Sequence, residues 1–146
     1  MGTKIRDVMT TRPRSVTPDT PLATVAEVMA TEDVGSVPVV EGDRLVGMVT
    51  DRDIVVRAIA KGKDPRGMPA HEAASRELVV LQPEEDLSDA LQLMAQHQVR
   101  RLPVVEDGER LVGVVAQADV ARDAKEKETG ELVQVISQPP QGPRTP

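Results

Sequence analysis

One stretch of this 146-residue chain combines a hydroxyl and a carboxylate side chain at a spacing that suits a small ligand, and a second stretch keeps only the carboxylate. Thr50 and Asp53 stand three positions apart, and the second stretch has Ala116 and Asp119 at the same separation. A carboxylate can accept both hydroxyls of a vicinal diol in charge-assisted hydrogen bonds, each contributing ~1.5–3 kcal/mol. The same spacing is typical of a helix N-cap, in which the two side chains accept hydrogen bonds from each other's backbone amides. The pattern therefore predicts either a diol site or a helix cap alone, and both interpretations stay open.

Two adjacent arginines are the candidate cations for an anionic group. Arg100 and Arg101 precede a valine-rich segment, whereas the first stretch has the small residues Gly35 and Ser36 at the equivalent positions. A planar guanidinium can bond two phosphate oxygens at once, and Arg14 could add to the same positive region. A solvated charge or an ion pair with one of the 24 acids is the commoner role for a single arginine, so that alternative also stays open.

The composition excludes several classes of chemistry. The chain has no Cys, Phe, Trp or Tyr, and its two histidines are far apart in the sequence. These absences remove thiolate nucleophiles, disulfides, cysteine-built zinc sites and aromatic platforms for stacking nucleobases. Because no nucleophile–base pair or cluster of metal ligands is evident, we expect no catalytic residue, no metal site and no enzymatic activity.

Charge and hydropathy narrow the range of partners. Eighteen Lys and Arg oppose 24 Asp and Glu, and the resulting net charge of −6 disfavours binding to nucleic acid. The first residues lack the apolar stretch of a signal peptide, and no run approaches the ~18 apolar residues of a membrane span. The sequence therefore predicts a cytoplasmic protein that binds neither nucleic acid nor membrane.

An internal repeat organises the chain into two copies of one module. Residues 34–41 align with residues 99–106 at an offset of 65, and one added residue after Glu41 changes the offset to 66, which pairs Asp53 with Asp119. A module of about 60 residues buries only a marginal core by itself, so we expect the two copies to pack face to face and share one core. The predicted boundaries are copy one at 1–60, a linker at 61–68, copy two at 69–126, a short helix at 127–137 and a disordered tail at 138–146.

Each copy predicts the same order of elements, β-α-β-β-α. The first helix follows Thr20 or Asp86 as its capping residue and has apolar residues at helical spacing. Two valine-rich strands joined by a tight Gly-Asp or Asp-Gly turn indicate a hairpin, and a second helix begins near Thr50 or Ala116. The strands are predicted at residues 15–16, 37–40 and 45–49 of copy one and at residues 78–81, 102–105 and 111–115 of copy two.

These motifs resemble a tandem pair of CBS (cystathionine-β-synthase) domains, the arrangement often called a Bateman module. The resemblance covers about residues 4–123. It rests on the paired hydrophobic-Pro-Val-Val strands, on the Gly-x-x-Thr-Asp-Arg-Asp sequence at residues 47–53 and on the repeat length. It implies an α+β fold, like an α/β sandwich, in which the two β-α-β-β-α repeats pack with pseudo-two-fold symmetry. It also implies a stand-alone pair that forms a homodimer.

The resemblance implies a ligand site as well. CBS pairs commonly bind AMP, ADP, ATP or S-adenosylmethionine in the cleft between the copies, as regulatory ligands and not as required cofactors. In this chain the ribose would lie at Thr50 and Asp53, and the phosphates at Arg100 and Arg101 of the other copy. A second site at Asp119 is in doubt because alanine replaces the threonine there. Further nucleotide-binding candidates are Arg14, Val16, Val34, Gly35 and Val37, although the valines are equally well explained as core.

The resemblance thus predicts a non-catalytic regulatory module with an adenosine nucleotide as its ligand. It would signal through a change of conformation or through association with an unidentified effector protein. A ligand acts in this way only if it binds two states with different affinities. The alternative is a ligand-free structural or protein-interaction CBS dimer, which the missing threonine of copy two and the capping interpretation of copy one favour.

Overall fold

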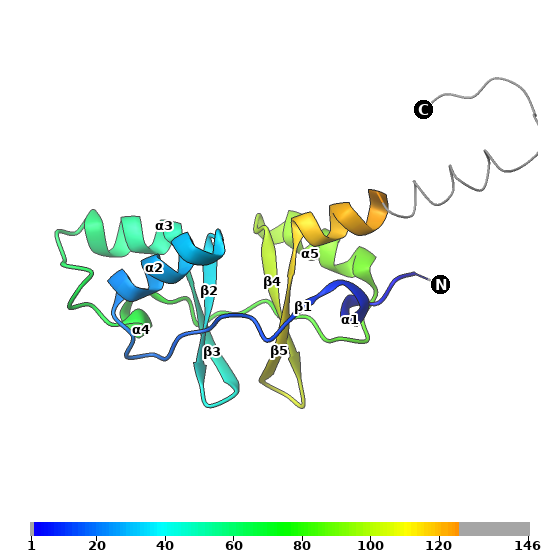
Figure 1. Ribbon diagram of the computed structural model, residues 1–146, viewed down its shortest axis with the longest axis horizontal. Coiled ribbons are helices and arrows are strands. Elements are labelled where there is room, and N and C mark those ends of the chain that lie inside the picture. Colours follow the sequence, from blue (N-terminus) through cyan, green and yellow to red (C-terminus); the bar gives the residue numbers. More distant parts are fainter. Residues whose placement is uncertain (1, 126–146) are drawn as a thin grey trace, which may run out of the picture.

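The computed structural model describes residues 2–125 and confirms an α+β fold built from two repeats (Figure 1). In chain order the elements are α1 (Ile5–Val8), β1 (Thr10–Thr11), α2 (Leu22–Glu32), β2 (Ser36–Glu41), β3 (Arg44–Thr50), α3 (Asp51–Ile54), the π-helical turn η1 (Val55–Ile59), α4 (Ala70–Ala73), α5 (Leu87–His97), β4 (Arg101–Glu106) and β5 (Arg110–Ala116). Residues 117–125 are also helical. The helix predicted at 127–137 and the tail predicted at 138–146 lie outside the described residues.

Two antiparallel hairpins form the centre of the molecule. β2 pairs with β3 and β4 pairs with β5, and both hairpins carry a bulge at the same place, after Val39 and after Val104. The turn that joins Glu41 to Arg44 has two residues, whereas the equivalent turn of copy two has three. The extra residue that changes the repeat offset therefore lies in a hairpin turn, and the predicted hairpin strands are confirmed.

The prediction that Thr20 caps the first helix of copy one is wrong, whereas Asp86 occupies the predicted N-cap of copy two without a side-chain hydrogen bond to the helix. Pro21 occupies the N-cap of α2, and Thr20 Oγ1 instead lies 3.1 Å from the Thr17 amide, which donates to it. Asp86 stands at the N-cap of α5, but its carboxylate accepts from Lys4 Nζ at 2.8 Å and not from a helix amide. An ammonium is a stronger donor than a neutral amide, and this hydrogen bond lowers the pKa of Asp86.

The short strands predicted ahead of each first helix are single bridges in the structure. Val16 bridges to Val39 of β2, and Leu81 bridges to Val104 of β4, both in parallel. A proline follows each bridging residue two positions later. Proline has no amide proton to donate to a neighbouring strand, so the pairing ends there.

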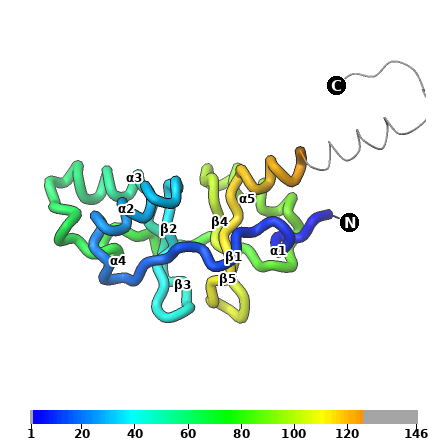
Figure 2. The backbone as a smooth tube through the Cα atoms, viewed as in Figure 1, coloured from blue at the N-terminus to red at the C-terminus, as the bar shows by residue number. Residues whose placement is uncertain are grey.

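The first segment of each copy packs on the other copy, and we call these segments, residues 5–11 and 70–75, the two lead-ins. Ile5 is fully buried in the core of copy two, and β1 pairs with β5. Ala70 is likewise fully buried in the core of copy one, and Ser75 bridges to β3. Figure 2 shows α1 in the lobe of copy two and α4 in the lobe of copy one.

Glycine at each crossing point lets a lead-in lie directly against a strand. A Cβ atom at Gly113 of β5 would stand 2.9 Å from the carbonyl oxygen of Thr10. At the equivalent Gly47 of β3, a Cβ atom would stand 3.2 Å from the carbonyl oxygen of Ser75. Both glycines therefore serve the close approach of backbone to backbone, which is a common reason for glycine inside a strand.

The expectation of one shared core is wrong, because each copy has its own. One cluster of buried residues lies in copy one and a second lies in copy two, and each is completed by the lead-in of the other copy. The hairpin turns also touch, since the Leu45 amide donates to the Glu109 carbonyl and the Leu111 amide donates to the Asp43 carbonyl, both at 2.9 Å. The exchanged lead-ins add the apolar surface that a module of about 60 residues lacks.

Candidate functional site

The Thr50–Asp53 pair lies where β3 ends and α3 begins. Thr50 is the N-cap of α3, and its Oγ1 accepts a hydrogen bond from the Asp53 amide at 3.0 Å. The Thr50 amide donates in return to Asp53 Oδ2 at 2.9 Å. This reciprocal arrangement is a capping box, so the helix cap is present and one carboxylate oxygen is already used.

The second oxygen of the Asp53 carboxylate is less engaged. Asp53 Oδ1 lies 3.8 Å from Arg57 Nε, which is an ion pair but is too long for a hydrogen bond. The Arg57 guanidinium donates instead to the Ala73 carbonyl, with Nη1 at 3.1 Å from the oxygen. The Asp53 side chain is 17% exposed, so a ligand can reach it. Oδ1 is therefore an acceptor that a ligand donor could use without breaking the cap.

Copy two uses both oxygens of its aspartate. The Ala116 amide donates to Asp119 Oδ2 at 2.9 Å, as in copy one. Asp119 Oδ1, however, accepts a hydrogen bond from Arg122 Nη2, also at 2.9 Å. A ligand at Asp119 would have to displace this arginine, so the two aspartates differ in their availability.

The capping box predicts the stability of a Thr50→Ala variant. Loss of the hydroxyl leaves the Asp53 amide without its acceptor, and we expect the free energy of unfolding to fall by about 1 kcal/mol. Urea unfolding followed by far-UV circular dichroism measures the change. Thr50→Ser keeps the hydroxyl and should stay close to the wild type, and an alanine variant as stable as the serine variant would contradict the role of the cap.

The loops before β2 and β4 lie beside the starts of the second helices. The Asp51 amide donates to the Gly35 carbonyl at 2.9 Å, and the Gln117 amide donates to the Arg100 carbonyl at 2.8 Å. Arg100 is exposed, and Arg101 is half-buried at the start of β4. Each loop is thus brought to the aspartate of its own copy, and within residues 2–125 no hydrogen bond or ion pair joins these arginines to the aspartate of copy one.

The other predicted site residues have ordinary structural partners. Arg14 forms an ion pair with Glu32, with Nη1 3.4 Å from Oε1. Val16 and Val37 are buried in the core of copy one, and Val34 packs against that core. The structure therefore places these three valines in or against the core, which is one of the two roles that the sequence left open for them.

No sequence motif marks a cavity of about 460 Å³ at the other end of copy one, next to the hairpin turn. The signal that could have found it is a mismatch in the repeat, because the cavity-lining Ala74 aligns with the much larger Met9. Within residues 2–125, no three His, Cys, Asp or Glu side chains are placed to hold a metal ion. None of the helices in that range has the length and apolar character needed to cross a membrane.

The geometry of paired hairpins, exchanged lead-ins and equivalent aspartates is that of a known family. The family profile described as "CBS domain" matches residues 5–59 and 70–126. The chain belongs to the CBS domain family. The two matched segments correspond to the two copies of the repeat, so this is a tandem CBS pair.

Two bacterial CBS proteins match most of the chain. The CBS domain-containing protein YhcV of Bacillus subtilis is 48% identical over 117 residues, which are 80% of this chain and 82% of that protein. Hypoxic response protein 1 of Mycobacterium tuberculosis is 37% identical over 138 residues, which are 94% of this chain and 96% of that protein. The match takes up most of the length of both relatives.

A solved structure of a CBS protein with a nucleotide has the same fold. The crystal structure of CBSX2 in complex with AMP superposes on this CBS pair with a TM-score of 0.77 and 27% sequence identity. The match covers 87% of this chain and 99% of the CBSX2 chain. A CBS pair of this shape thus binds AMP in that protein.

Proposed function

We propose that this CBS pair is a non-catalytic regulatory module that binds an adenosine nucleotide at the Asp53 end of copy one. The observation that carries the proposal is Asp53 Oδ1, which keeps a 3.8 Å separation from its nearest cation while Oδ2 maintains the cap. The AMP complex of CBSX2 supports the choice of ligand class. Copy two is the weaker candidate because Arg122 donates to the corresponding oxygen.

A ribose would meet complementary groups at this position. Its two vicinal hydroxyls are donors, and a free carboxylate oxygen accepts them in charge-assisted hydrogen bonds. The Thr50 hydroxyl accepts from the Asp53 amide, but its own proton remains available to a ligand acceptor. The helix cap and the ribose contact are therefore compatible, and the two interpretations of the motif need not exclude each other.

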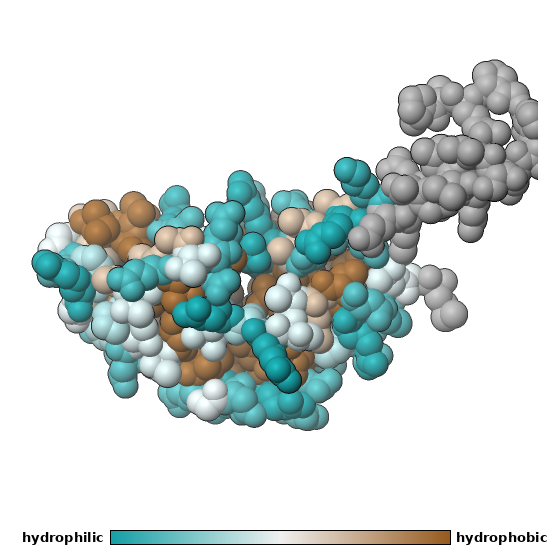
Figure 3. Space-filling view, viewed as in Figure 1, coloured by the Kyte–Doolittle hydropathy of each residue, from teal (hydrophilic) through white to brown (hydrophobic). Residues whose placement is uncertain are grey.

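The phosphates would lie toward Arg100 and Arg101. Neither guanidinium forms a hydrogen bond or ion pair with another side chain of the described range, so both charges are available. In the space-filling view the surface is hollowed between the two copies, which gives a phosphate group a path from one copy toward the other (Figure 3). A guanidinium that bonds two phosphate oxygens would then link the copies through the ligand.

The alternative function is a protein-interaction module, and an apolar helix face favours it as a second candidate. Val55, Val56 and Ile59 of η1 are 57%, 43% and 54% exposed, and brown surface marks this end of copy one in Figure 3. The equivalent helix positions of copy two are Ala121, Arg122 and Lys125. An apolar face of this kind suits contact with another protein surface, and we propose a second copy of this chain, giving a homodimer, as the partner.

Titration calorimetry with AMP, ATP and S-adenosylmethionine tests the proposed function. The chain has no tryptophan or tyrosine to report binding by fluorescence, so heat is the direct signal. We expect saturable binding of at least one of the three, at about one ligand per chain. The melting temperature should rise with ligand concentration, because bound ligand increases the free energy of unfolding, by ~2.7 kcal/mol at 100 times Kd. No heat and no thermal shift with all three compounds would overturn the proposal and leave the interaction module.

A further inference from the structure

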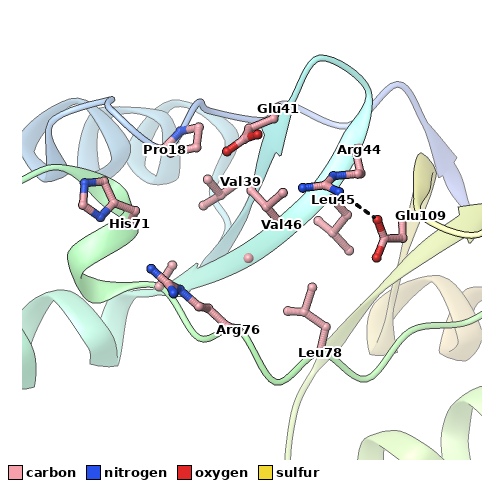
Figure 4. Close-up of a pocket in the computed structure, with 12 residues that line it drawn as sticks. Pro18, Val39, Glu41, Arg44, Leu45, Val46, His71, Arg76, Leu78 and Glu109 are labelled. Atoms are coloured by element: carbon pink, nitrogen blue, oxygen red, sulfur yellow. Dashed lines mark ion pairs between the residues drawn. The ribbon is translucent and has the colours of Figure 1, made fainter.

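The cavity of about 460 Å³ in copy one is distant from the proposed nucleotide site. Arg44 and Glu41 line it at the hairpin turn, whereas Thr50 stands at the opposite end of β3. Figure 4 shows the aliphatic side chains Val39, Val46 and Leu78 across its middle. Its volume lies in the range of about 300–1,000 Å³ that small-molecule pockets occupy.

The equivalent place in copy two is filled by a side chain. Met9 packs on Gly113, and its Sδ lies 2.7 Å from where a Cβ atom of that glycine would be. The residue at this position in copy one is Ala74, which packs on Gly47 with a methyl group only. The smaller alanine side chain leaves space in copy one that the Met9 side chain occupies in copy two.

The charged groups around the cavity also differ from those of copy two. In copy two, Arg110 donates to Glu106 at 2.8 Å and to Asp107 at 3.1 Å, and the hydrogen bond to Asp107 raises the pKa of Arg110. In copy one the equivalent Arg44 turns to Glu109 of the other copy, at a separation of 3.5 Å. The hairpin arginine of copy two therefore pairs with acids of its own copy, whereas the hairpin arginine of copy one pairs with an acid of the other copy.

Arg76 is a cation of the cavity lining that has no charged partner among the described residues. It lines the wall contributed by the second lead-in and its continuation, and its guanidinium has no ion pair or hydrogen bond with any residue of the described range. Figure 4 shows Arg76 and His71 at one end, and Arg44 with Glu41 and Glu109 at the other. Because two acids flank the single Arg44, the cavity has one free cationic end, an aliphatic middle and one end whose formal charges sum to −1.

We propose that this cavity binds a small organic carboxylate with an aliphatic body. The planar guanidinium of Arg76 forms two parallel hydrogen bonds with the carboxylate, a geometry for which arginine is well suited. The aliphatic body lies over Val39, Val46 and Leu78. Glu109 belongs to copy two and its carbonyl accepts from Leu45 at the contact between the hairpin turns, so an occupant touches both copies at their junction.

Nuclear magnetic resonance of the full ¹⁵N-labelled chain tests this site with sodium hexanoate as the probe and hexylamine as its cationic counterpart. We expect hexanoate to shift the amide resonances of Gly47, Ala74 and Leu78 in a saturable way, and hexylamine to leave them unchanged. Arg76→Gln should weaken hexanoate binding at least tenfold. Arg66→Gln is the matched control, because that arginine is exposed in the segment between the copies and pairs with Asp64.

Ala74→Met fills the cavity with the side chain that copy two already has. We expect it to abolish the hexanoate shifts while the spectrum stays dispersed, as in the wild type. Absence of saturable shifts in the wild type, equal shifts with hexylamine, or undiminished binding in a folded Ala74→Met protein would each overturn the proposal. If the methionine variant does not fold, Arg76→Gln against Arg66→Gln decides. The result is independent of the nucleotide titration, because the two sites share no residue.

Discussion

Replacing Ile5 by alanine should lower the free energy of unfolding by about 3 kcal/mol, the usual cost of truncating a fully buried aliphatic side chain to alanine. The Ile5 side chain is 0% exposed in the core of copy two, among Leu81, Leu87 and Leu102. The expected loss therefore measures what the first lead-in contributes to that core.

The chain offers a matched control in Ile59, which is 54% exposed on η1. Ile59→Ala should change the free energy of unfolding by less than about 0.5 kcal/mol, as exposed substitutions usually do. Urea unfolding followed by far-UV circular dichroism serves for both variants. If Ile5→Ala is as mild as Ile59→Ala, the first lead-in contributes little to the core of copy two, and the exchange is not a source of stability.

If the proposed nucleotide site is right, Asp53→Asn should weaken AMP binding about tenfold or more, and Asp119→Asn should change it less than threefold. A hydrogen bond to a charged acceptor contributes ~1.5–3 kcal/mol, and each 1.4 kcal/mol is a factor of ten in affinity. Asp53 Oδ1 is free to accept from the ribose, whereas Asp119 Oδ1 already accepts from Arg122 at 2.9 Å. The same calorimetric titration as for the wild type measures both variants.

The asparagine substitution separates binding from folding. Its amide oxygen can still accept from the Thr50 amide, so the helix cap is kept and the free energy of unfolding should change little. Equal losses of affinity at Asp53 and Asp119 would mean that both copies bind AMP and would contradict the asymmetry. Unchanged affinity in both variants would place the nucleotide elsewhere in the pair.

The hairpins could be predicted from sequence because their signals are local. Alternating valines and a Gly-Asp or Asp-Gly turn determine strand pairing within a few residues, and the internal repeat provides the same evidence twice. The lead-in exchange could not be predicted in this way. The repeat aligns Ile5 with Ala70, but a four-residue helix has no pattern that says which of two similar hairpins it packs on.

The residues of the candidate site could be predicted from the sequence, but the distances between its arginines and aspartates could not. The sequence shows that Arg57 is four positions after Asp53, whereas Arg122 is three positions after Asp119. Both spacings place the arginine on the same helix face as the aspartate. Only the structure distinguishes a separation of 3.8 Å from a hydrogen bond of 2.9 Å, and this difference is the reason for proposing Asp53 over Asp119 as the ligand-binding carboxylate.

The exchanged lead-ins impose an order of events on the newborn chain. The first lead-in leaves the ribosome long before β5, the strand on which it docks, has been made. At the usual 5–20 residues per second, its apolar side chain waits roughly 5–20 s for a partner. The core of copy one is also incomplete during synthesis, but for a shorter time, because it lacks Ala70 and Ala73 only until the second lead-in emerges. Neither half can reach its final packing during synthesis before part of the other exists, so we expect a chain stopped between the copies to remain incompletely folded.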